Sequence, residues 1–80
     1  MQEVLLVEDD DRLSMLVSEF LQEQGFNVTR LADGEKLLTT IQAKAPDIII
    51  LDVMLPGENG FKLCRNIRPH YNGPLLFMTA

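Results

Sequence analysis

Apolar residues occur along this chain in two arrangements, short unbroken runs and stripes with helical spacing. Unbroken runs fill residues 4–7, 48–51 and 75–78. Runs of this length, rich in branched side chains, are typical of parallel strands that are buried on both faces. Residues 26–31 instead alternate in part between apolar and polar side chains, which predicts a more exposed strand near the sheet edge.

Helical spacing follows the first strand. After Asp10, apolar residues recur at i, i+3, i+4, i+7 and i+8, which predicts an amphipathic helix that Gly25 terminates. The apolar face of this helix comprises Leu13, Leu16, Val17, Phe20 and Leu21. Ser14 and Met15 lie off that face, so we expect them to be exposed to solvent. Asp10 is expected to be either the N-terminal cap or a first-turn acid of this helix.

Two shorter helices are predicted further along the chain. The first carries apolar residues between positions 37 and 41 and closes before Pro46. The second follows a loop at residues 55–60, which contains Pro and Gly, and ends at Pro69. The residues of this second helix that we expect to face the sheet are Phe61, Leu63, Cys64 and Ile67.

The resulting order is strand, helix, strand, helix, strand, helix, strand. Such a series predicts an α/β fold with a doubly wound parallel sheet and right-handed crossovers. The chain stops at the fourth strand, so we expect residues 1–80 to be part of a longer domain. If the polypeptide instead ended at Ala80, its last strand would be an open apolar edge that invites pairing with another chain.

Composition narrows the possible partners and compartments. The chain has 80 residues, 46% of them hydrophobic, which is enough for one small globular domain. Its net charge of -5 disfavours direct binding to nucleic acid or to an anionic membrane. Cys64 is the only cysteine and four methionines are present, as expected in a reducing cytoplasm. No apolar stretch approaches the roughly 20 residues that span a bilayer.

Acidic side chains follow two of the predicted buried strands. Glu8 and Asp9 come directly after residues 4–7, and Asp52 ends the run at 48–51. In open α/β sheets, ligands bind outside the carboxyl ends of the strands. Carboxylates that converge there repel one another, and a bound hard cation such as Mg²⁺ relieves that repulsion. A carboxylate can also act as a nucleophile toward a phosphoryl group.

Four motifs in order make the chain resemble a known family. Residues 6–10 (LVEDD), 47–52 (DIIILD), 53–60 (VMLPGENG) and 78–80 (MTA) are similar to the receiver domain of bacterial two-component response regulators. The Pro-Gly loop and Cys64-Arg65 most resemble the OmpR/PhoB-like subfamily, whose receivers precede a winged-helix DNA-binding domain, and residues 68–79 resemble RstA-type regulators. The resemblance implies a CheY/flavodoxin-like sheet with strand order 2-1-3-4-5, with the fifth strand absent from this chain.

The resemblance also implies a role for each matching residue. Asp52 would be the phosphoacceptor, and Asp9 and Asp52 would ligate Mg²⁺ directly. Glu8 would act through a metal-bound water, and the backbone carbonyl of Met54 would be a further ligand. Thr79 would be the switch hydroxyl that turns toward the phosphoryl group.

The same resemblance also implies a role for Ala80 and the partners with which the protein interacts. Ala80, small and next to Thr79, would leave access to the acyl phosphate. A sensor histidine kinase would be the phosphoryl donor, a homodimer would form on phosphorylation, and DNA would be bound only by an output domain that these residues do not encode. The family's Lys at the end of the fifth strand has no counterpart here. Such a protein is a switch that modifies itself, not an enzyme in the usual sense.

Two other functions compete with this one. A phosphorylation-independent interaction module would keep the acidic pocket without the complete switch, and the absent Lys supports it. A nucleotide-binding domain or metal-dependent phosphohydrolase is disfavoured, because no Gly-rich loop follows the first strand and Met54 stands where a second acid would be expected after Asp52.

Overall fold

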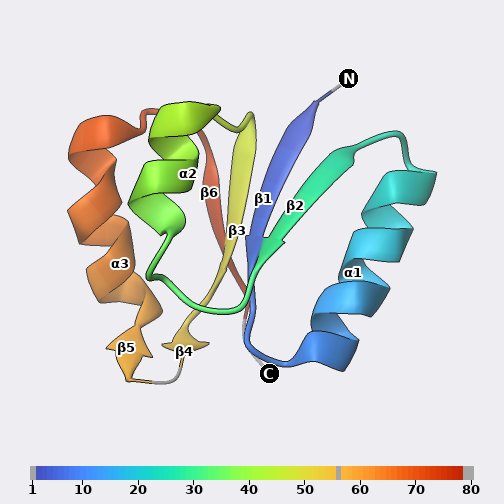
Figure 1. Cartoon of the computed structure of the whole chain (residues 1–80), viewed down its shortest axis with the longest axis horizontal. Helices are drawn as coiled ribbons and strands as arrows, with labels where there is room; N and C mark the ends of the chain where they lie inside the picture. The colour runs from blue at the N-terminus through green and yellow to red at the C-terminus, as the bar shows by residue number, and fades with distance from the viewer. Residues whose placement is uncertain (1, 56, 79–80) are drawn as a thin grey trace.

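A four-stranded parallel sheet forms the centre of the computed structural model, which describes residues 2–55 and 57–78 (Figure 1). The strands, in their order across the sheet, are β2 (Asn27–Leu31), β1 (Glu3–Val7), β3 (Ile48–Asp52) and β6 (Leu75–Met78). The predicted α/β class with a doubly wound parallel sheet is therefore confirmed. β2 lies at one edge, as its alternating pattern predicted.

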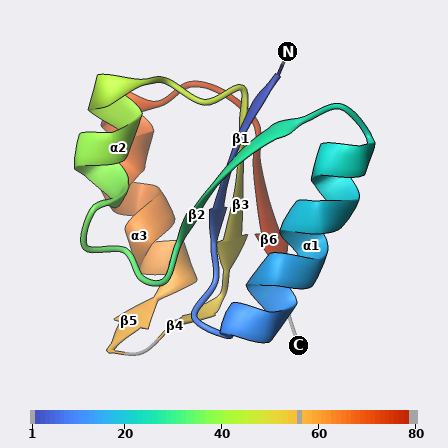
Figure 2. The same ribbon diagram turned by 45° about the vertical axis from the view of Figure 1, so that its right-hand side comes forward.

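The helices lie on both faces of the sheet. α2 (Leu37–Ala43) and α3 (Gly60–Ile67) cover one face, while α1 (Asp11–Glu23) covers the other (Figures 1 and 2). A 3-10 turn, η1 (Arg68–His70), follows α3. Within the described residues no helix combines the length and apolarity needed to cross a membrane.

Strand register explains how one face of the sheet builds the core. β1 pairs with β3 so that Val7 lies opposite Leu51, and β3 pairs with β6 so that Asp52 lies opposite Met78. Alternate side chains point toward α2 and α3, because side chains along a strand alternate between faces. The buried residues of this core are Leu5, Val7, Leu37, Ile41, Ile49, Leu51, Leu55, Leu63, Ile67 and Tyr71.

The side chains that α1 buries differ from those that the sequence predicted. Leu16 and Phe20 were expected to pack on the sheet but are 59% and 60% exposed, whereas Ser14 and Ser18 are buried. α1 packs against β2 and β1, on the face of the sheet opposite α2 and α3 (Figure 2). The two small serines let the helix approach the sheet closely, while Leu16 and Phe20 remain uncovered. The expectation that Ser14 is exposed was wrong.

Two details after β3 also correct the sequence prediction. The loop predicted at 55–60 contains a short antiparallel hairpin, β4 (Met54–Leu55) and β5 (Glu58–Asn59). Phe61 does not face the core as expected; it is 51% exposed and packs on Phe77 with ring centroids 4.6 Å apart. Phe77 is itself 40% exposed, so this aromatic pair lies at the margin of the sheet.

Candidate functional site

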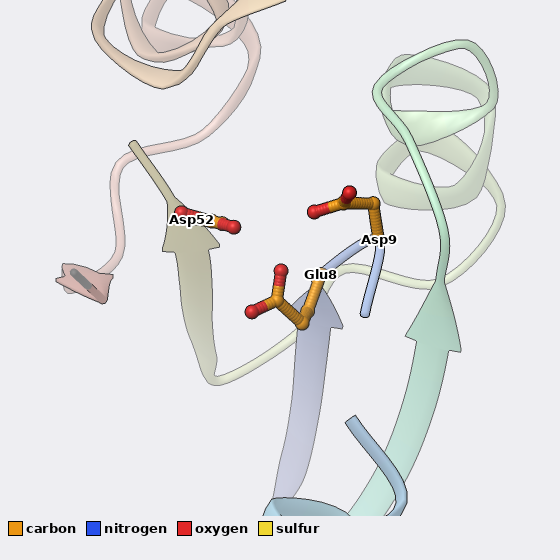
Figure 3. A group of neighbouring side chains, drawn as sticks. All are labelled: Glu8, Asp9 and Asp52. Carbon is orange, nitrogen blue, oxygen red and sulfur yellow. The ribbon is translucent and has the colours of Figure 1, made fainter. Parts of the chain in front are cut away.

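Three carboxylates converge at the carboxyl ends of β1 and β3 (Figure 3). Glu8 and Asp9 follow β1, and Asp52 is the last residue of the neighbouring β3. One carboxylate oxygen from each residue lies within 4.8 Å of those of the other two. Because parallel neighbours end at the same edge of the sheet, the register alone brings these acids together. The predicted convergence of the strand-end acids is present in the structure.

The Glu8 carboxylate lies in an electrostatically unfavourable environment. Its side chain is buried, and its Oε2 atom has no hydrogen-bond partner among the described residues. Burial, together with the adjacent Asp52 carboxylate, raises the pKa of Glu8 to about 7. A buried carboxylate oxygen without a donor is costly unless a proton or a cation compensates it. The site therefore favours a positively charged ligand.

Asp52 is held by the hairpin that follows it. Its side chain is also buried, and Oδ1 accepts a hydrogen bond of 3.0 Å from the Met54 backbone N–H. Gly60 packs directly against the backbone of residues 52 and 53 and donates its N–H to the Val53 carbonyl at 2.8 Å. These backbone contacts fix the direction in which the Asp52 carboxylate points.

The next two acids have other partners. Asp10 is the N-cap of α1, one of its two predicted roles, and accepts a hydrogen bond of 3.1 Å from the Leu13 N–H. Asp11 is exposed and pairs with Arg30 of β2 at 3.6 Å. Capping occupies the Asp10 carboxylate, so the cluster available to a cation is limited to Glu8, Asp9 and Asp52 within the described part of the chain.

A pocket of about 390 Å³ opens beside the cluster. It is lined by Glu8, Asp9, Asp10, Leu13, Asp52, Val53 and Met54. A larger pocket of about 580 Å³ lies along β5 and α3, with Glu58 as its one acid among the described residues. Convergent charge, and not volume, distinguishes the smaller pocket as the candidate site.

The donor set suits magnesium. All three side chains offer oxygen only, which is the ligand type that Mg²⁺ prefers. Few protein oxygens and an adjoining pocket leave room for water and a phosphate group, as Mg²⁺ sites usually require. The unpartnered oxygen of Glu8 is an independent indication that this cluster fits a cation.

Two predicted site residues, Thr79 and Ala80, lie outside the described residues. Met54 is described and 81% exposed, next to the cluster. Sequence reasoning missed a role for Glu58, which it treated as a surface charge; its Oε2 accepts a hydrogen bond of 3.2 Å from the Gly34 N–H. Nothing in the sequence signals this contact, because the two residues meet only once the sheet has formed.

Comparison with known families gives a direct result. Residues 4–80 match the family described as "Response regulator receiver domain". The chain belongs to this family. The receiver-domain resemblance of the four motifs is thereby confirmed, and so is the doubly wound topology that it implied.

Curated relatives of this receiver domain are transcription regulators. It is 42% identical over 80 residues to the transcriptional regulatory protein AfsQ1 of Streptomyces coelicolor and covers 36% of that protein. It is 37% identical over 79 residues to the DNA-binding response regulator MtrA of Mycolicibacterium smegmatis, covering 99% of this chain and 35% of MtrA. The chain thus spans about a third of the length of these relatives.

Solved receiver domains have the same fold. The BeF₃-activated N-terminal receiver domain of Klebsiella pneumoniae RstA matches with a TM-score of 0.90 and 32% identity, over 96% of this chain and 66% of that one. The response regulator TrrA of Thermotoga maritima, in complex with Mg²⁺-BeF, matches with a TM-score of 0.91 and 30% identity, over 100% of this chain and 70% of that one.

Proposed function

We propose that this receiver domain accepts a phosphoryl group on Asp52 from a sensor histidine kinase, in a reaction that needs Mg²⁺. The observation that carries the proposal is the convergence of Glu8, Asp9 and Asp52 at one sheet edge, with a buried Glu8 oxygen that lacks a partner. The structures of two similar receivers, described as BeF₃-activated or complexed with Mg²⁺-BeF, support this function.

Each residue has a stated part in this reaction. Asp9 and Asp52 would hold Mg²⁺ directly, with the Met54 carbonyl as a further ligand and Glu8 in support. When bound, the ion neutralises negative charge on the phosphoryl oxygens. Thr79 is proposed as the hydroxyl donor to the phosphoryl group, and Ala80 as the small residue that leaves access to it.

The bond changes are those of a phosphoryl transfer. An Asp52 carboxylate oxygen forms the new bond to phosphorus, while the bond from phosphorus to the imidazole nitrogen of the kinase breaks. That nitrogen keeps the electron pair. The protein contributes mainly position and charge, because this transfer asks for an aligned nucleophile and neutralised oxygens. Residues 1–80 therefore act as a phosphoacceptor switch.

Phosphorylation can be tested by intact-protein mass spectrometry after incubation with acetyl phosphate and Mg²⁺. We expect a gain of one phosphoryl group, about 80 Da, that depends on Mg²⁺ and disappears in Asp52→Ala. Asp47→Ala, which changes an acid at the opposite end of β3, should keep the gain. No gain in the wild type would favour the alternative, an interaction module that works without phosphorylation.

The names of the relatives indicate what kind of domain this receiver would control. AfsQ1 is described as a transcriptional regulatory protein and MtrA as a DNA-binding response regulator. We infer that this receiver controls a DNA-binding domain beyond these 80 residues and forms a homodimer on phosphorylation, in the cytoplasm. The net charge of -5 argues against DNA binding by residues 1–80 themselves.

The kinase is proposed to dock on α1 beside the acidic pocket. Met15 is 45% exposed and Leu16 59% exposed, so α1 presents apolar surface next to the cluster. We expect Met15→Lys to slow phosphoryl transfer from the partner kinase about tenfold, the cost of one buried apolar contact. Phosphorylation by acetyl phosphate should not change. Gln22→Lys, exposed at the far end of α1, is the matched control; equal slowing in both variants would contradict this docking surface.

A further inference from the structure

The hairpin β4–β5 connects Asp52 to the loop after β2. At one end, the Met54 N–H donates to Asp52 Oδ1 at 3.0 Å. Met54 pairs with Asn59, and Leu55 pairs with Glu58. At the other end, Glu58 Oε2 accepts the Gly34 N–H at 3.2 Å. A continuous set of contacts therefore leads from the Asp52 carboxylate to the β2–α2 loop.

β5 is the strand of this hairpin that needs an anchor, because β4 is already held by Leu55, which is buried in the core. Each strand has only two residues, and isolated two-stranded hairpins are marginally stable even when longer. Glu58 and Asn59 are exposed, so burial does not fix β5. The Asn59 side chain does anchor one side, because it accepts the Phe61 N–H of α3 at 2.8 Å. The contact between Glu58 and Gly34 anchors the other side.

The two partners approach very closely. A Cβ atom added to Gly34 would lie only 2.5 Å from Glu58 Oε2 and 2.6 Å from the Leu63 side chain. Gly34 therefore leaves space that the Glu58 carboxylate and Leu63 use. Close backbone approach of this kind is one of the positions that glycine alone fills without strain.

We propose that Glu58 is a positioning residue for the Asp52 site: by bonding to the Gly34 N–H it holds the β4–β5 hairpin so that Met54 stays in place beside Asp52. The proposal rests on the function proposed above, in which the Met54 carbonyl and the Asp52 carboxylate hold Mg²⁺. It adds a residue that touches neither the cation nor the phosphoryl group and acts only through the hairpin.

Charge and position make different predictions for Glu58. If Glu58 acted by attracting the cation over a distance, removal of its negative charge would weaken Mg²⁺ binding whatever replaced it. If it acts by position, Glu58→Gln should behave like the wild type, because the amide oxygen can still accept the Gly34 N–H. Glu58→Ala removes both the charge and the acceptor. Glu35→Ala removes an exposed acid from the partner loop and is the charge-matched control.

The first measurement is amide hydrogen exchange by NMR without metal. We expect the Met54 amide to exchange about three- to tenfold faster in Glu58→Ala than in the wild type, the size expected for loss of one hydrogen bond. Glu58→Gln and Glu35→Ala should exchange at the wild-type rate. Unchanged exchange in Glu58→Ala, with the fold intact by circular dichroism, would overturn the proposal.

The second measurement is the Mg²⁺ affinity by isothermal titration calorimetry. We expect Glu58→Ala to bind Mg²⁺ about three- to tenfold more weakly than the wild type, the change in affinity that corresponds to the loss of one hydrogen bond. Glu58→Gln should bind Mg²⁺ with the wild-type affinity. Equal weakening in Glu58→Ala and Glu58→Gln would show that charge, not position, is responsible and would overturn the proposal. A wild type that does not bind Mg²⁺ would instead overturn the proposed function, and the metal-free exchange rates would still decide whether Glu58 positions Met54.

Discussion

Without divalent cations at pH 8, Glu8→Gln should be more stable to unfolding than the wild type by about 3 kcal/mol. The reason is the raised pKa of Glu8, about 7 in the folded protein against an ordinary value of 4.5. At pH 8 the folded wild type must hold a charged, buried Glu8 carboxylate beside Asp52. Glutamine occupies the same volume without that charge, so the cost of burying the charge disappears.

The sign of the pH dependence follows from which state binds the proton. Between pH 4.5 and about 7 the folded protein keeps a proton on Glu8 that the unfolded chain has lost. The free energy of unfolding contributed by Glu8 is thus fully present below pH 4.5 and falls as the pH rises toward 7. Above pH 7 both states are ionised, and the loss is complete. The stability of Glu8→Gln should lack this fall.

Urea unfolding followed by circular dichroism between pH 4.5 and 8.5 measures this effect. Glu19→Gln, a neutral substitution of an exposed acid on α1, should retain the wild-type pH profile. Millimolar Mg²⁺ should stabilise the wild type at pH 8 more than Glu8→Gln, since the cation compensates the same charge. Parallel pH profiles for the wild type and Glu8→Gln would show that Glu8 ionises without strain.

Local patterns in the sequence were sufficient to predict the sheet and its acidic edge. Buried parallel strands need continuous apolar runs, and the runs at 4–7 and 48–51 have the length and the branched side chains of such strands. Acids placed directly after two such runs must lie at the same sheet edge if the strands are neighbours. The strand order itself came from the family resemblance, and the structure agrees with it.

Long-range packing could not be predicted in the same way. Helical periodicity shows that α1 has an apolar stripe, but the burial of that stripe depends on what else covers the sheet. Ser14 and Ser18 are buried, while Leu16 and Phe20 are exposed. The spacing of apolar residues along one helix does not show which other parts of the protein cover the sheet beside it.

The surroundings of the site residues could not be predicted from the sequence either. The sequence indicated that Glu8 and Asp52 converge, but the absence of a hydrogen-bond partner for Glu8 Oε2 among the described residues depends on side-chain directions that only the structure shows. The hairpin after Asp52 was invisible because two-residue strands leave no periodicity to detect. Glu58 is an acid in a polar loop, which is the sequence pattern of an ordinary surface charge. Only the structure shows that its carboxylate lies against Gly34.

Gly60→Ala should be among the most damaging single substitutions in the chain, destabilising it by about 3 kcal/mol or more. A Cβ at this position would lie 2.8 Å from the Val53 Cα and closer still to the Asp52 carbonyl oxygen. Both are backbone atoms of the segment that leaves β3, so they cannot rotate away as a side chain would. The backbone must shift, and the Asp52 carboxylate moves with it.

The same variant should lose phosphorylation under conditions where it remains folded. Its Asp52 would be displaced from Glu8 and Asp9, so the initial rate of phosphorylation by acetyl phosphate with Mg²⁺ should fall about a hundredfold, the cost of misplacing a reacting group by about 1 Å. Gly25→Ala is the matched control: Gly25 has φ +95° and no atom within 4 Å of an added Cβ. That control should lose about 1–2 kcal/mol through backbone strain alone and keep its phosphorylation. If Gly60→Ala were as active and as stable as Gly25→Ala, the close packing of α3 on the backbone of residues 52 and 53 could not be what orients Asp52.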